Sequence, residues 1–289
     1  MDTTTATSTT QPENAKSEVK NAKTVPQSKP IKAHARATSL DKMYETLVKG
    51  LKKFFADNNF KRGVVGVSGG VDSCLTLKIA VDALGAENVT AVLMPELGLS
   101  KQENIDHSKI LCQYLAVNCY YLPINNFLAD FNVAPWKPSP LAKMNTKARV
   151  RSVLLYNLAN TENCLVLGTS NKSELLLGYG TKYGDLAADV EVIGDLFKTE
   201  VGKLANHIGL PPEIVDKTPS AELSPCQTDE QDLGAPYEDL DKVLMKLDLG
   251  SQICIEHGLP AALVNLVFRR VSDNKHKTQL PPVIKANEN

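Results

Sequence analysis

The sequence predicts an α/β protein with a doubly wound parallel sheet and helices on both faces. Short apolar segments alternate along the chain with longer segments of helical periodicity. Within the apolar segments, polar and apolar side chains do not alternate, which is typical of strands buried on both faces. Polar stretches follow two of these segments, at residues 68–73 and 169–174. In a parallel sheet such stretches meet at the carboxyl ends of the strands, where ligands bind.

The first half of this pattern begins at residue 39. Ser39 is expected to be the N-cap of a helix whose apolar side chains recur at helical spacing, namely Leu40, Met43, Tyr44, Leu47, Leu51, Phe54 and Phe55. The strand that follows leads into a glycine-rich turn and a helix, and Gly85 is expected to end that helix. The expected elements are strand 64–67, helix 74–84, strand 89–95, helix 101–117 and strand 119–124.

The second half is interrupted by prolines and glycines. Pro135, Pro138 and Pro140 mark a break before a long helix over roughly residues 141–160. A fourth strand, residues 164–168, opens into the polar stretch 169–174, and a further helix begins near Lys198. Two later stretches, 178–189 and 219–230, are polar and irregular. The second of them is suited to a lid.

Composition limits the classes of function. The chain has 289 residues, 43% of them hydrophobic, which is enough for one large domain or two small ones. A formal charge of −1 gives no general attraction to nucleic acid or to an anionic membrane. No apolar run has the length that a membrane span requires, and the N-terminus lacks the apolar core of a signal peptide. We therefore expect neither a nucleic-acid nor a membrane partner.

Residues 1–38 differ in composition from the rest of the chain. They are rich in Thr, Ser, Ala, Lys and Pro, contain no Leu, Phe, Tyr or Trp, and carry a net charge of +3. Such a segment cannot bury enough apolar surface to offset the entropy of ordering. We expect a disordered tail over residues 1–38 and a folded domain over residues 39–289.

The cysteines indicate a reducing compartment. The six cysteines include no CxxC pair and no metal-ligand spacing. Several of them lie inside apolar runs, where a reduced thiol is a small core residue. A cytoplasmic location is the simplest interpretation.

The glycine-rich turn after the first strand carries the strongest chemical signal. Gly69 and Gly70 permit backbone angles that a Cβ would forbid, so several N–H groups can point into one concavity. Ser68 and Ser73 add hydroxyl donors, and the following helix directs its positive dipole end to the same place. Asp72 would repel a bare phosphate, but it suits a divalent cation held between carboxylate and phosphate. The alternative is an ordinary tight strand-to-helix turn.

The residues of this turn match one family of nucleotide-binding loops. The sequence Ser-Gly-Gly-Val-Asp-Ser, residues 68–73, has neither the lysine of GxxxxGK[ST] nor the spacing of GxGxxG. It resembles the pyrophosphate loop of ATP pyrophosphatases, enzymes that split ATP into AMP and pyrophosphate. Five more segments occur in the order seen in ammonia-dependent NAD synthetases: Gly-Thr-Ser-Asn-Lys-Ser-Glu, Thr-Lys-Tyr-Gly-Asp, Leu-Phe-Lys-Thr-Glu-Val, Pro-Ser-Ala-Glu-Leu and Gln-Thr-Asp-Glu. The resemblance covers the chain from about residue 40 to about residue 280.

This resemblance implies the last step of NAD formation on an adenine nucleotide alpha hydrolase-like fold. The nicotinate carboxylate of deamido-NAD is adenylated by ATP, pyrophosphate leaves, and ammonia then displaces AMP to give the amide. The resemblance also implies Mg²⁺ as cofactor, ATP as co-substrate, and a homodimer with substrate near its interface. Glutamine-dependent relatives carry an extra amidase domain with a nucleophilic cysteine. The short tail without cysteine favours free ammonia, unless a separate glutaminase supplies it.

Roles for individual residues also follow from the resemblance. Asp72 and Glu174 are expected to ligate Mg²⁺ and, with Lys198, to form the catalytic group. The expected ATP site comprises Gly66, Val67, Ser68, Gly69, Gly70, Val71, Asp72, Ser73, Thr169, Lys198 and Ser220. The expected deamido-NAD site comprises Arg149, Lys182, Asp189, His276 and Lys277. The chain departs from the family pattern at Leu186, Ala187 and Cys226, where glycine is common, at Ser220, which replaces threonine, and at Thr278, which replaces arginine.

The residues alone leave other interpretations open. A glutamate such as Glu174 in a first helical turn is also favoured by the helix dipole. Arg149 beside Arg151 also fits a solvated basic face, and His276-Lys277 also fits an exposed tail.

Other classes of protein share part of the pattern. A tRNA-thiolating pyrophosphatase needs a sulfur relay and an RNA-binding patch, but the chain has no CxxC and residues 39–289 carry a net charge of −4. GMP and asparagine synthetases would share only the glycine-rich loop. A regulator that senses ATP without turnover would need neither Glu174 nor the 178–189 stretch.

Overall fold

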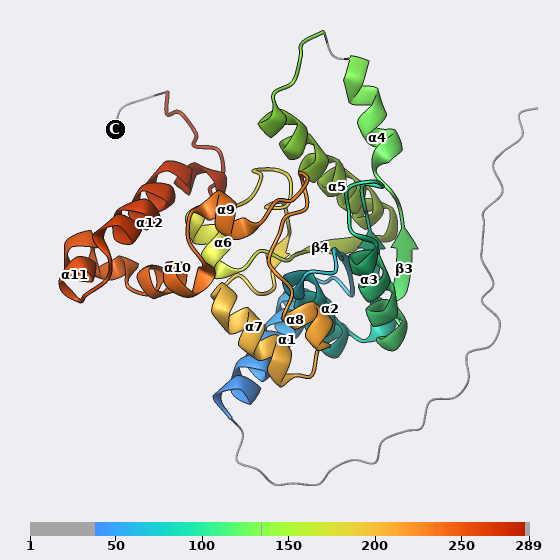
Figure 1. The fold of residues 1–289 in the computed structure, drawn as a ribbon. Coiled ribbons are helices and arrows are strands. Elements are labelled where there is room, and N and C mark those ends of the chain that lie inside the picture. The colour runs from blue at the N-terminus through green and yellow to red at the C-terminus, as the bar shows by residue number, and fades with distance from the viewer. Residues whose placement is uncertain (1–37, 134, 287–289) are drawn as a thin grey trace, which may run out of the picture. The chain divides into compact units, whose positions relative to one another are not determined.

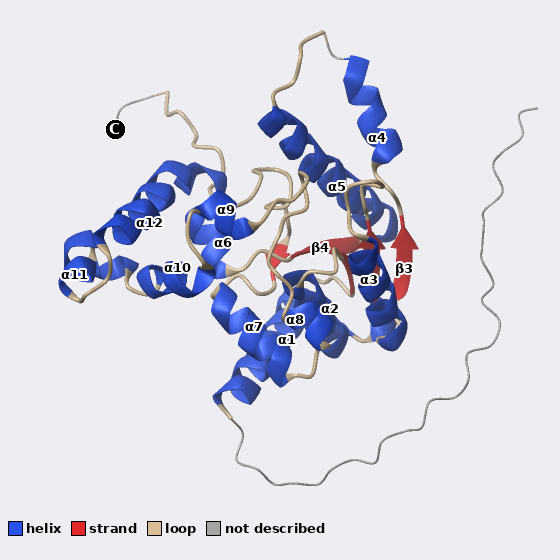
Figure 2. Cartoon of the chain, viewed as in Figure 1, coloured by secondary structure: helices blue, strands red, loops and turns tan. Residues whose placement is uncertain are grey.

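The computed structural model describes residues 38–133 and 135–286. Its centre is a parallel sheet with the strand order β3-β2-β1-β4-β5 (Figure 2). The strands are β1 (Arg62–Gly66), β2 (Val89–Leu93), β3 (Asn118–Tyr121), β4 (Cys164–Gly168) and β5 (Val190–Glu191). Every neighbouring pair is parallel, which requires a crossover connection between consecutive strands. The predicted α/β class and parallel sheet are confirmed.

Helices connect the strands and continue beyond the sheet (Figure 1). The helices before β4 are α1 (Ser39–Asp57), α2 (Val71–Leu84), α3 (Gln102–Tyr114), α4 (Asn125–Ala129) and α5 (Pro140–Glu162). Those after β4 are α6 (Lys172–Leu177), α7 (Lys198–His207), α8 (Pro212–Val215), α9 (Asp229–Leu233), α10 (Tyr237–Leu244), α11 (Ser251–Glu256) and α12 (Ala261–Asn274). Short 3-10 turns are η1 (Ala86–Asn88), η2 (Asp130–Val133), η3 (Leu247–Leu249) and η4 (Lys275–Lys277).

Two apolar cores cover the two faces of the sheet. On one face, α1, α2, α3, α7 and α8 pack around side chains such as Val65, Ala91 and Leu93. On the other face, α5 packs against Val64 and Val92. A third core joins α6, α10, α11 and α12 into a helical lobe beside the sheet. Burial of these apolar side chains is the main favourable free energy of the fold.

Several predicted element boundaries need correction; β1 ends at Gly66, β2 at Leu93 and α3 at Tyr114, each earlier than expected. The N-cap of α1 is Thr38, not Ser39, because the Thr38 side chain accepts from Asp41 N (3.1 Å) and completes a capping box. The second helix begins at Val71 instead of residue 74, so Asp72 lies in its first turn. Residues 122–124 do not belong to β3. Residues 229 and 230, expected in an irregular stretch, belong to α9.

One strand also differs from the expected burial pattern. All four residues of β3 are exposed, because β3 is the edge strand of the sheet. The central strands β1 and β2 are buried as predicted. The predicted tail, residues 1–38, lies outside the described residues except for Thr38. Among the described residues, no helix is long and apolar enough to cross a membrane.

Candidate functional site

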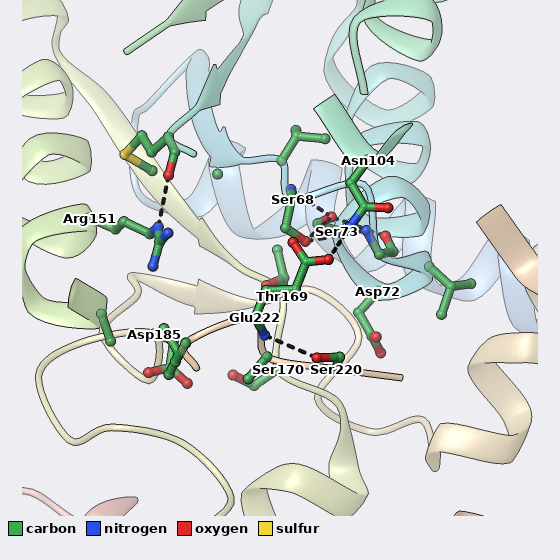
Figure 3. A pocket seen from close by; sticks show the side chains of 18 of the residues that line it. Ser68, Asp72, Ser73, Asn104, Arg151, Thr169, Ser170, Asp185, Ser220 and Glu222 are labelled. Carbon is green, nitrogen blue, oxygen red and sulfur yellow. Dashed lines mark hydrogen bonds between the residues drawn. The ribbon is translucent and has the colours of Figure 1, made fainter. Parts of the chain in front are cut away.

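A cavity of about 300 Å³ opens at the carboxyl ends of β1 and β4 (Figure 3). Its walls come from the turn after β1, the turn after β4, the starts of α2, α6 and α7, and residues 217–223. Most of the residues that the sequence predicts for ATP and Mg²⁺ line it, namely Gly66, Val67, Ser68, Gly70, Val71, Asp72, Ser73, Thr169, Glu174, Lys198 and Ser220. The two polar stretches therefore meet at one site, as predicted.

The turn after β1 is held by its own serine hydroxyls. Ser73 Oγ accepts from Ser68 N (3.2 Å) and donates to Gly70 O (3.0 Å), while Gly70 N donates to Ser68 Oγ (3.3 Å). Gly69 does not line the cavity. Its φ is +81°, and a Cβ here would lie 2.5 Å from the backbone oxygen of Asn104. The turn is thus closely packed, and only glycine fits at position 69.

Asp72 joins the two halves of the site. Its Oδ1 accepts from Asn171 Nδ2 in the turn after β4 (2.9 Å), and its Oδ2 forms an ion pair with the ammonium of Lys198. The Lys198 side chain is only 9% exposed. Burial lowers the pKa of Lys198, but the carboxylates of Asp72 and Glu174 outweigh this effect and raise it. Lys198 therefore carries its charge at any physiological pH.

Glu174 has a structural contact and also lines the cavity. Its backbone N donates to Asn171 Oδ1 (3.0 Å), and its Oε2 accepts from Asn171 N (3.1 Å), which makes a capping box at the start of α6. Burial raises the pKa of Glu174 well above its ordinary value, the nearby Asp72 raises it further, and Lys198 lowers it. Two carboxylates thus compete for one lysine.

A third carboxylate, that of Asp229, is also close enough to Lys198 to raise its pKa. Asp229, which is 4% exposed, accepts from the hydroxyls of Tyr179 (3.0 Å) and Tyr237 (3.3 Å). The ammonium of Lys198 lies 5.5 Å from the centroid of the Tyr237 ring. The charge of Asp229 also helps to raise the pKa of Lys198. This cluster was missed from the sequence: Asp229 lies in the recognised Gln-Thr-Asp-Glu segment, but Tyr237 has no motif around it.

Buried polar contacts fix the start of α7, and with it Lys198. Lys198 N donates to Ser173 Oγ (2.9 Å), and Thr199 N donates to Asp241 Oδ2 (2.9 Å). Ser173 Oγ in turn donates to Asp241 Oδ1. Asp241 is 1% exposed, so this network satisfies backbone donors that have no partner within the helix.

Residues 219–228 cover one side of the cavity and are folded back on themselves. Ser220 Oγ donates to Gln227 O (2.7 Å), and Gln227 Oε1 accepts from Leu223 N (2.9 Å). Glu222 accepts from Asn104 Nδ2 on α3, which ties the segment to the sheet side of the cavity. The hydroxyl of Ser220, predicted as an ATP contact, shapes this segment in the structure.

Cys226 has a φ of +57°, in the left-handed region that favours glycine. Cys226 therefore places a Cβ in a backbone conformation that glycine adopts more easily.

The residues predicted for deamido-NAD do not line the cavity. Four of them lie together where the 178–184 loop meets the C-terminal segment. Arg149 Nε donates to Lys182 O (3.3 Å), and Lys182 Nζ donates to His276 O (2.6 Å). Lys277 Nζ donates to Gly178 O (2.8 Å). Since Gly184 of the same loop lines the cavity, this basic cluster is next to it.

Asp189 has a different environment. Its Oδ2 accepts from Val166 N (2.7 Å), and its Oδ1 accepts from the Tyr156 hydroxyl (3.4 Å). The carboxylate thus extends the hydrogen bonding of β4. The predicted contact of Asp189 with a dinucleotide stays a prediction, as do those of the basic cluster.

Several polar residues in the cavity were not predicted. Arg151 lines it and donates from Nε to Met94 O (3.0 Å). Asn104, Lys217 and Asp185 line it as well. Figure 3 shows Arg151, Asp185 and Asn104 around the same space as the serine turn. Arg151 and Asp185 lay in segments that the sequence singled out, whereas Asn104 and Lys217 lie in segments with no motif.

The carboxylates of the site fit Mg²⁺. Among residues 38–133 and 135–286, no group of three or more His, Cys, Asp or Glu side chains is placed to hold a metal ion. Asp72 and Glu174 instead form a pair. Mg²⁺ is commonly bound by one or two carboxylates together with substrate phosphates and water. Because the two carboxylates share the charge of one lysine, an additional cation would relieve their repulsion.

Comparison with known proteins identifies the family. The model of the NAD synthase family matches residues 43–281. The chain belongs to the NAD synthase family. It is 40% identical over 251 residues to the NH(3)-dependent NAD(+) synthetase of Methanocaldococcus jannaschii, covering 84% of this chain and 96% of that relative. The protein is therefore an enzyme, a ligase of this family, and these matches support NAD formation.

Solved structures agree with this family. An NH3-dependent NAD synthetase from Campylobacter jejuni superposes with a TM-score of 0.74 and 30% identity, over 86% of this chain and all of the other. An NMN synthetase from Francisella tularensis superposes with a TM-score of 0.77 and 28% identity, over 86% of this chain and 99% of the other. The sheet and its helices thus have the arrangement of NAD synthetases.

Proposed function

We propose that the protein converts deamido-NAD, ATP and ammonia into NAD, AMP and pyrophosphate through an adenylated carboxylate. The observation that carries this proposal is the meeting of the serine turn, Asp72, Glu174 and Lys198 in one cavity. A polyphosphate, a divalent cation and a buried ammonium can be combined there. Membership of the NAD synthase family supplies the reaction to which such a site is suited.

ATP binds with its phosphates at the serine turn. The hydroxyls of Ser68 and Ser73 and the first N–H groups of α2 surround this end of the cavity. Lys198, Thr169 and Ser220 also line the cavity. Ordered donors of this kind stabilise charge on the leaving pyrophosphate without rearranging.

Asp72 and Glu174 are the residues that would hold Mg²⁺. When bound, it neutralises charge on the phosphates and leaves less repulsion between ATP and the dinucleotide. For Asp72 to ligate the ion, its contact with Lys198 must loosen. Lys198 is then free to pair with a phosphate oxygen, while Asp229 continues to hold its charge in place.

The chemical steps need no nucleophile from the protein. A nicotinate carboxylate oxygen attacks the α-phosphorus of ATP, and the bond to the pyrophosphate oxygen breaks. Ammonia then attacks the carboxyl carbon of the acyl adenylate, the bond to AMP breaks, and the ammonia nitrogen loses a proton. The chain contributes positioning and charge stabilisation, as in other phosphoryl transfers.

The dinucleotide occupies the side of the cavity next to the 178–184 loop. Arg149, Lys182 and Lys277 lie together there and supply positive charge for its phosphates, and His276 is proposed as a further contact. Asp189, at the end of the 178–189 stretch, is proposed as a further contact. In this arrangement the nicotinate carboxylate points toward the serine turn.

A homodimer with the dinucleotide near its interface is also part of the proposal. Large apolar side chains are exposed along η2 and α5 and in the segment between them, namely Phe131, Trp136, Leu141 and Val153. Such a surface is typical of a protein interface. We propose a cytoplasmic enzyme without nucleic-acid or membrane partners, with ammonia either free or supplied by a separate glutaminase. The six free cysteines suit a reducing compartment.

An assay of AMP release tests the function. Purified protein is incubated with ATP and Mg²⁺, with deamido-NAD or nicotinate mononucleotide, and with ammonium or glutamine. AMP and NAD formation that requires deamido-NAD and ammonium supports the proposal. A preference for the mononucleotide would instead place the protein with the NMN synthetase that resembles it in fold. Tight ATP binding without any AMP release would indicate a sensor.

A further inference from the structure

Two cysteines outside the cavity lie on either side of a tight turn between α3 and β3. Cys112 is in the last turn of α3 and is 1% exposed, whereas Cys119 is the second residue of β3 and is exposed. Ala116, with a φ of +54°, reverses the chain between them. Val117 N donates to Cys112 O (3.1 Å), so the backbone of the turn is closed next to the first cysteine.

The sheet register shows which way Cys119 faces. It is paired with Ala91 of β2, and Ala91 belongs to the same core as Cys112, on the α3 face of the sheet. Tyr120 points to the opposite face, as neighbours in a strand do, and its hydroxyl contacts Glu162 at the end of α5 (3.4 Å). The Cys119 side chain is therefore directed toward α3.

A neighbouring contact places the two cysteines opposite each other. Lys109 precedes Cys112 by one helical turn and shares its face of α3. Tyr121 follows Cys119 by two residues and shares its face of β3. The Lys109 ammonium lies 4.5 Å from the centroid of the Tyr121 ring. Since the chain reverses between helix and strand, the next pair along these two faces is Cys112 and Cys119.

We propose that Cys119 and Cys112 form an oxidisable thiol pair, in which a peroxide oxidises Cys119 and Cys112 then closes a disulfide. The pair lies outside the cavity and uses none of the residues that we place in the reaction with ATP. The proposal therefore does not depend on the proposed function.

The two thiols have different roles because their environments differ. A hydrogen bond from Cys112 lowers the pKa of Cys119, burial opposes this, and the charge of Lys109 lowers it further. The same hydrogen bond and burial raise the pKa of Cys112. Cys119 is thus the exposed thiol that ionises more readily and meets the oxidant, and Cys112 is the protected thiol that responds to it.

The reaction proceeds in two balanced steps. The Cys119 thiolate attacks one oxygen of hydrogen peroxide, the O–O bond breaks, and hydroxide leaves, so that the sulfur becomes a sulfenic acid. Cys112 sulfur then attacks Cys119 sulfur, the S–O bond breaks, and the hydroxyl leaves as water with the proton of the Cys112 thiol. Peroxide is reduced to two molecules of water, and the two thiols are oxidised to one disulfide.

The other cysteines do not offer this combination. Cys226 is exposed in the 219–228 segment, while Cys74, Cys164 and Cys254 are buried. Cytosolic disulfides are usually transient and sense redox state, and a strained or exposed pair is the kind that is readily reduced again. Because α3 also carries Asn104 of the cavity wall, oxidation would act on an element shared with the site.

Thiol counting on the full-length protein tests the proposal. The reduced protein is treated with a small excess of hydrogen peroxide, quenched and denatured, and its free thiols are counted. We expect the six thiols to fall to four, with a mass loss of two hydrogen atoms and a peptide that links Cys112 to Cys119. Dithiothreitol should restore all six.

Three variants separate the possible outcomes. Cys119→Ser, at an exposed position, should lose no thiols, and Cys112→Ser should accumulate a sulfenic acid at Cys119 that dimedone traps. Cys226→Ser is the matched exposed control and should lose two thiols like the parent. Thiol loss in Cys119→Ser equal to that of the parent, or oxidation of Cys119 without a linked peptide, would overturn the proposal.

Discussion

Lys198 is the buried cation next to three carboxylates, those of Asp72, Glu174 and Asp229. The site therefore has more negative than positive charge. Removing a charged group from water is unfavourable unless an opposite charge or a hydrogen bond replaces the lost hydration. Burial and the charge of Asp72 raise the pKa of Glu174 well above its ordinary value, so Glu174 bears a large part of this penalty. The same imbalance that weakens the fold is what a divalent cation would relieve.

Replacing Glu174 should make the protein more stable at neutral pH. The pKa of Glu174 is raised on folding, so the folded protein holds a proton that the unfolded chain has released. Stability therefore falls as pH rises from the unfolded to the folded pKa, by up to about 1.4 kcal/mol per pH unit. In urea denaturation, the free energy of unfolding of Glu174→Gln should equal that of the parent at about pH 5 and exceed it at about pH 8.

Glu200→Gln is the control for this comparison. Glu200 has the same N3 position in α7, where its Oε2 accepts from Phe197 N (2.9 Å), but it does not line the cavity. If Glu200→Gln shows the same pH-dependent gain as Glu174→Gln, the effect comes from helix capping and not from the neighbouring Asp72.

Replacing Asp72 should affect activity more than folding. Asp72→Asn keeps the contact with Asn171 but removes a charge that holds Lys198 and the proposed Mg²⁺. We expect kcat to fall by about 10²–10³-fold, the usual effect of removing one electrostatic stabiliser. The control is Asp82→Asn on the outer surface of the same helix, where the carboxylate pairs with Lys78. Parental kcat in Asp72→Asn at saturating Mg²⁺ would contradict the role.

At the scale of elements, the sequence predicted best where local chemistry decides the structure. The predicted and observed bounds of β4 are the same, residues 164 and 168. Asn163 turns the chain just before the strand, and a polar stretch follows it. The start of α2 was missed because Val71 to Ser73 read equally well as loop or helix. A local hydrogen bond decided this case, since Ser73 Oγ donates to Gly70 O and closes the turn at the start of the helix.

The Gln227 side chain makes several of the contacts that hold the 219–228 segment. Gln227 Oε1 accepts from Leu223 N and Ser224 N, and its Nε2 donates to Asp232 Oδ2 (2.7 Å). Gln227→Ala should loosen the segment and raise the KM for ATP about tenfold, the effect of losing about 1.4 kcal/mol of binding. Gln231→Ala, at an exposed position of α9, should leave the KM near that of the parent. An unchanged KM in Gln227→Ala would mean that the segment does not cover ATP.

The 178–184 loop is expected to serve the dinucleotide only. Lys182 lies outside the cavity and is held by carbonyl oxygens of the C-terminal segment, His276 O and Gln279 O. Lys182→Ala should raise the KM for deamido-NAD several-fold while the KM for ATP stays constant, because charge-assisted contacts contribute roughly 1.5–3 kcal/mol. Steady-state kinetics with each substrate varied in turn measures this, and equal changes in both constants would count against the assignment.

At the scale of the whole molecule, the sheet and the cavity could be predicted from the sequence, whereas the helical lobe could not. Residues 231–275 contain no motif, and their helices α10 to α12 are recognisable only through the apolar core that they share with α6. Yet this lobe supplies Tyr237 and Asp241, which hold Lys198 in place. Single-sequence patterns do not reveal such dependence, because long-range packing and not local spacing creates it.

Exposed apolar side chains bear on how many chains form the functional unit. Trp136, at 69% exposed, and Val153, at 67%, are large apolar side chains left open to solvent in the described part of the chain. A stable interface buries roughly 800 Å² on each partner, and exposed aromatic side chains at its centre contribute most of the binding energy. Light scattering of the parent should therefore give about twice the chain mass of 31.4 kDa.

Charge placed in this surface should separate the chains. Trp136→Asp combined with Val153→Asp would bury two unpaired carboxylates on each partner, which is unfavourable by several kcal/mol. We expect light scattering to give the mass of one chain, with far-ultraviolet circular dichroism unchanged. Ile110→Asp, at a 60% exposed apolar position on α3, is the matched control and should leave the mass of the dimer intact. If Ile110→Asp dissociates the dimer and the double variant does not, the chains associate through the α3 face, and the dinucleotide site is then not near the interface.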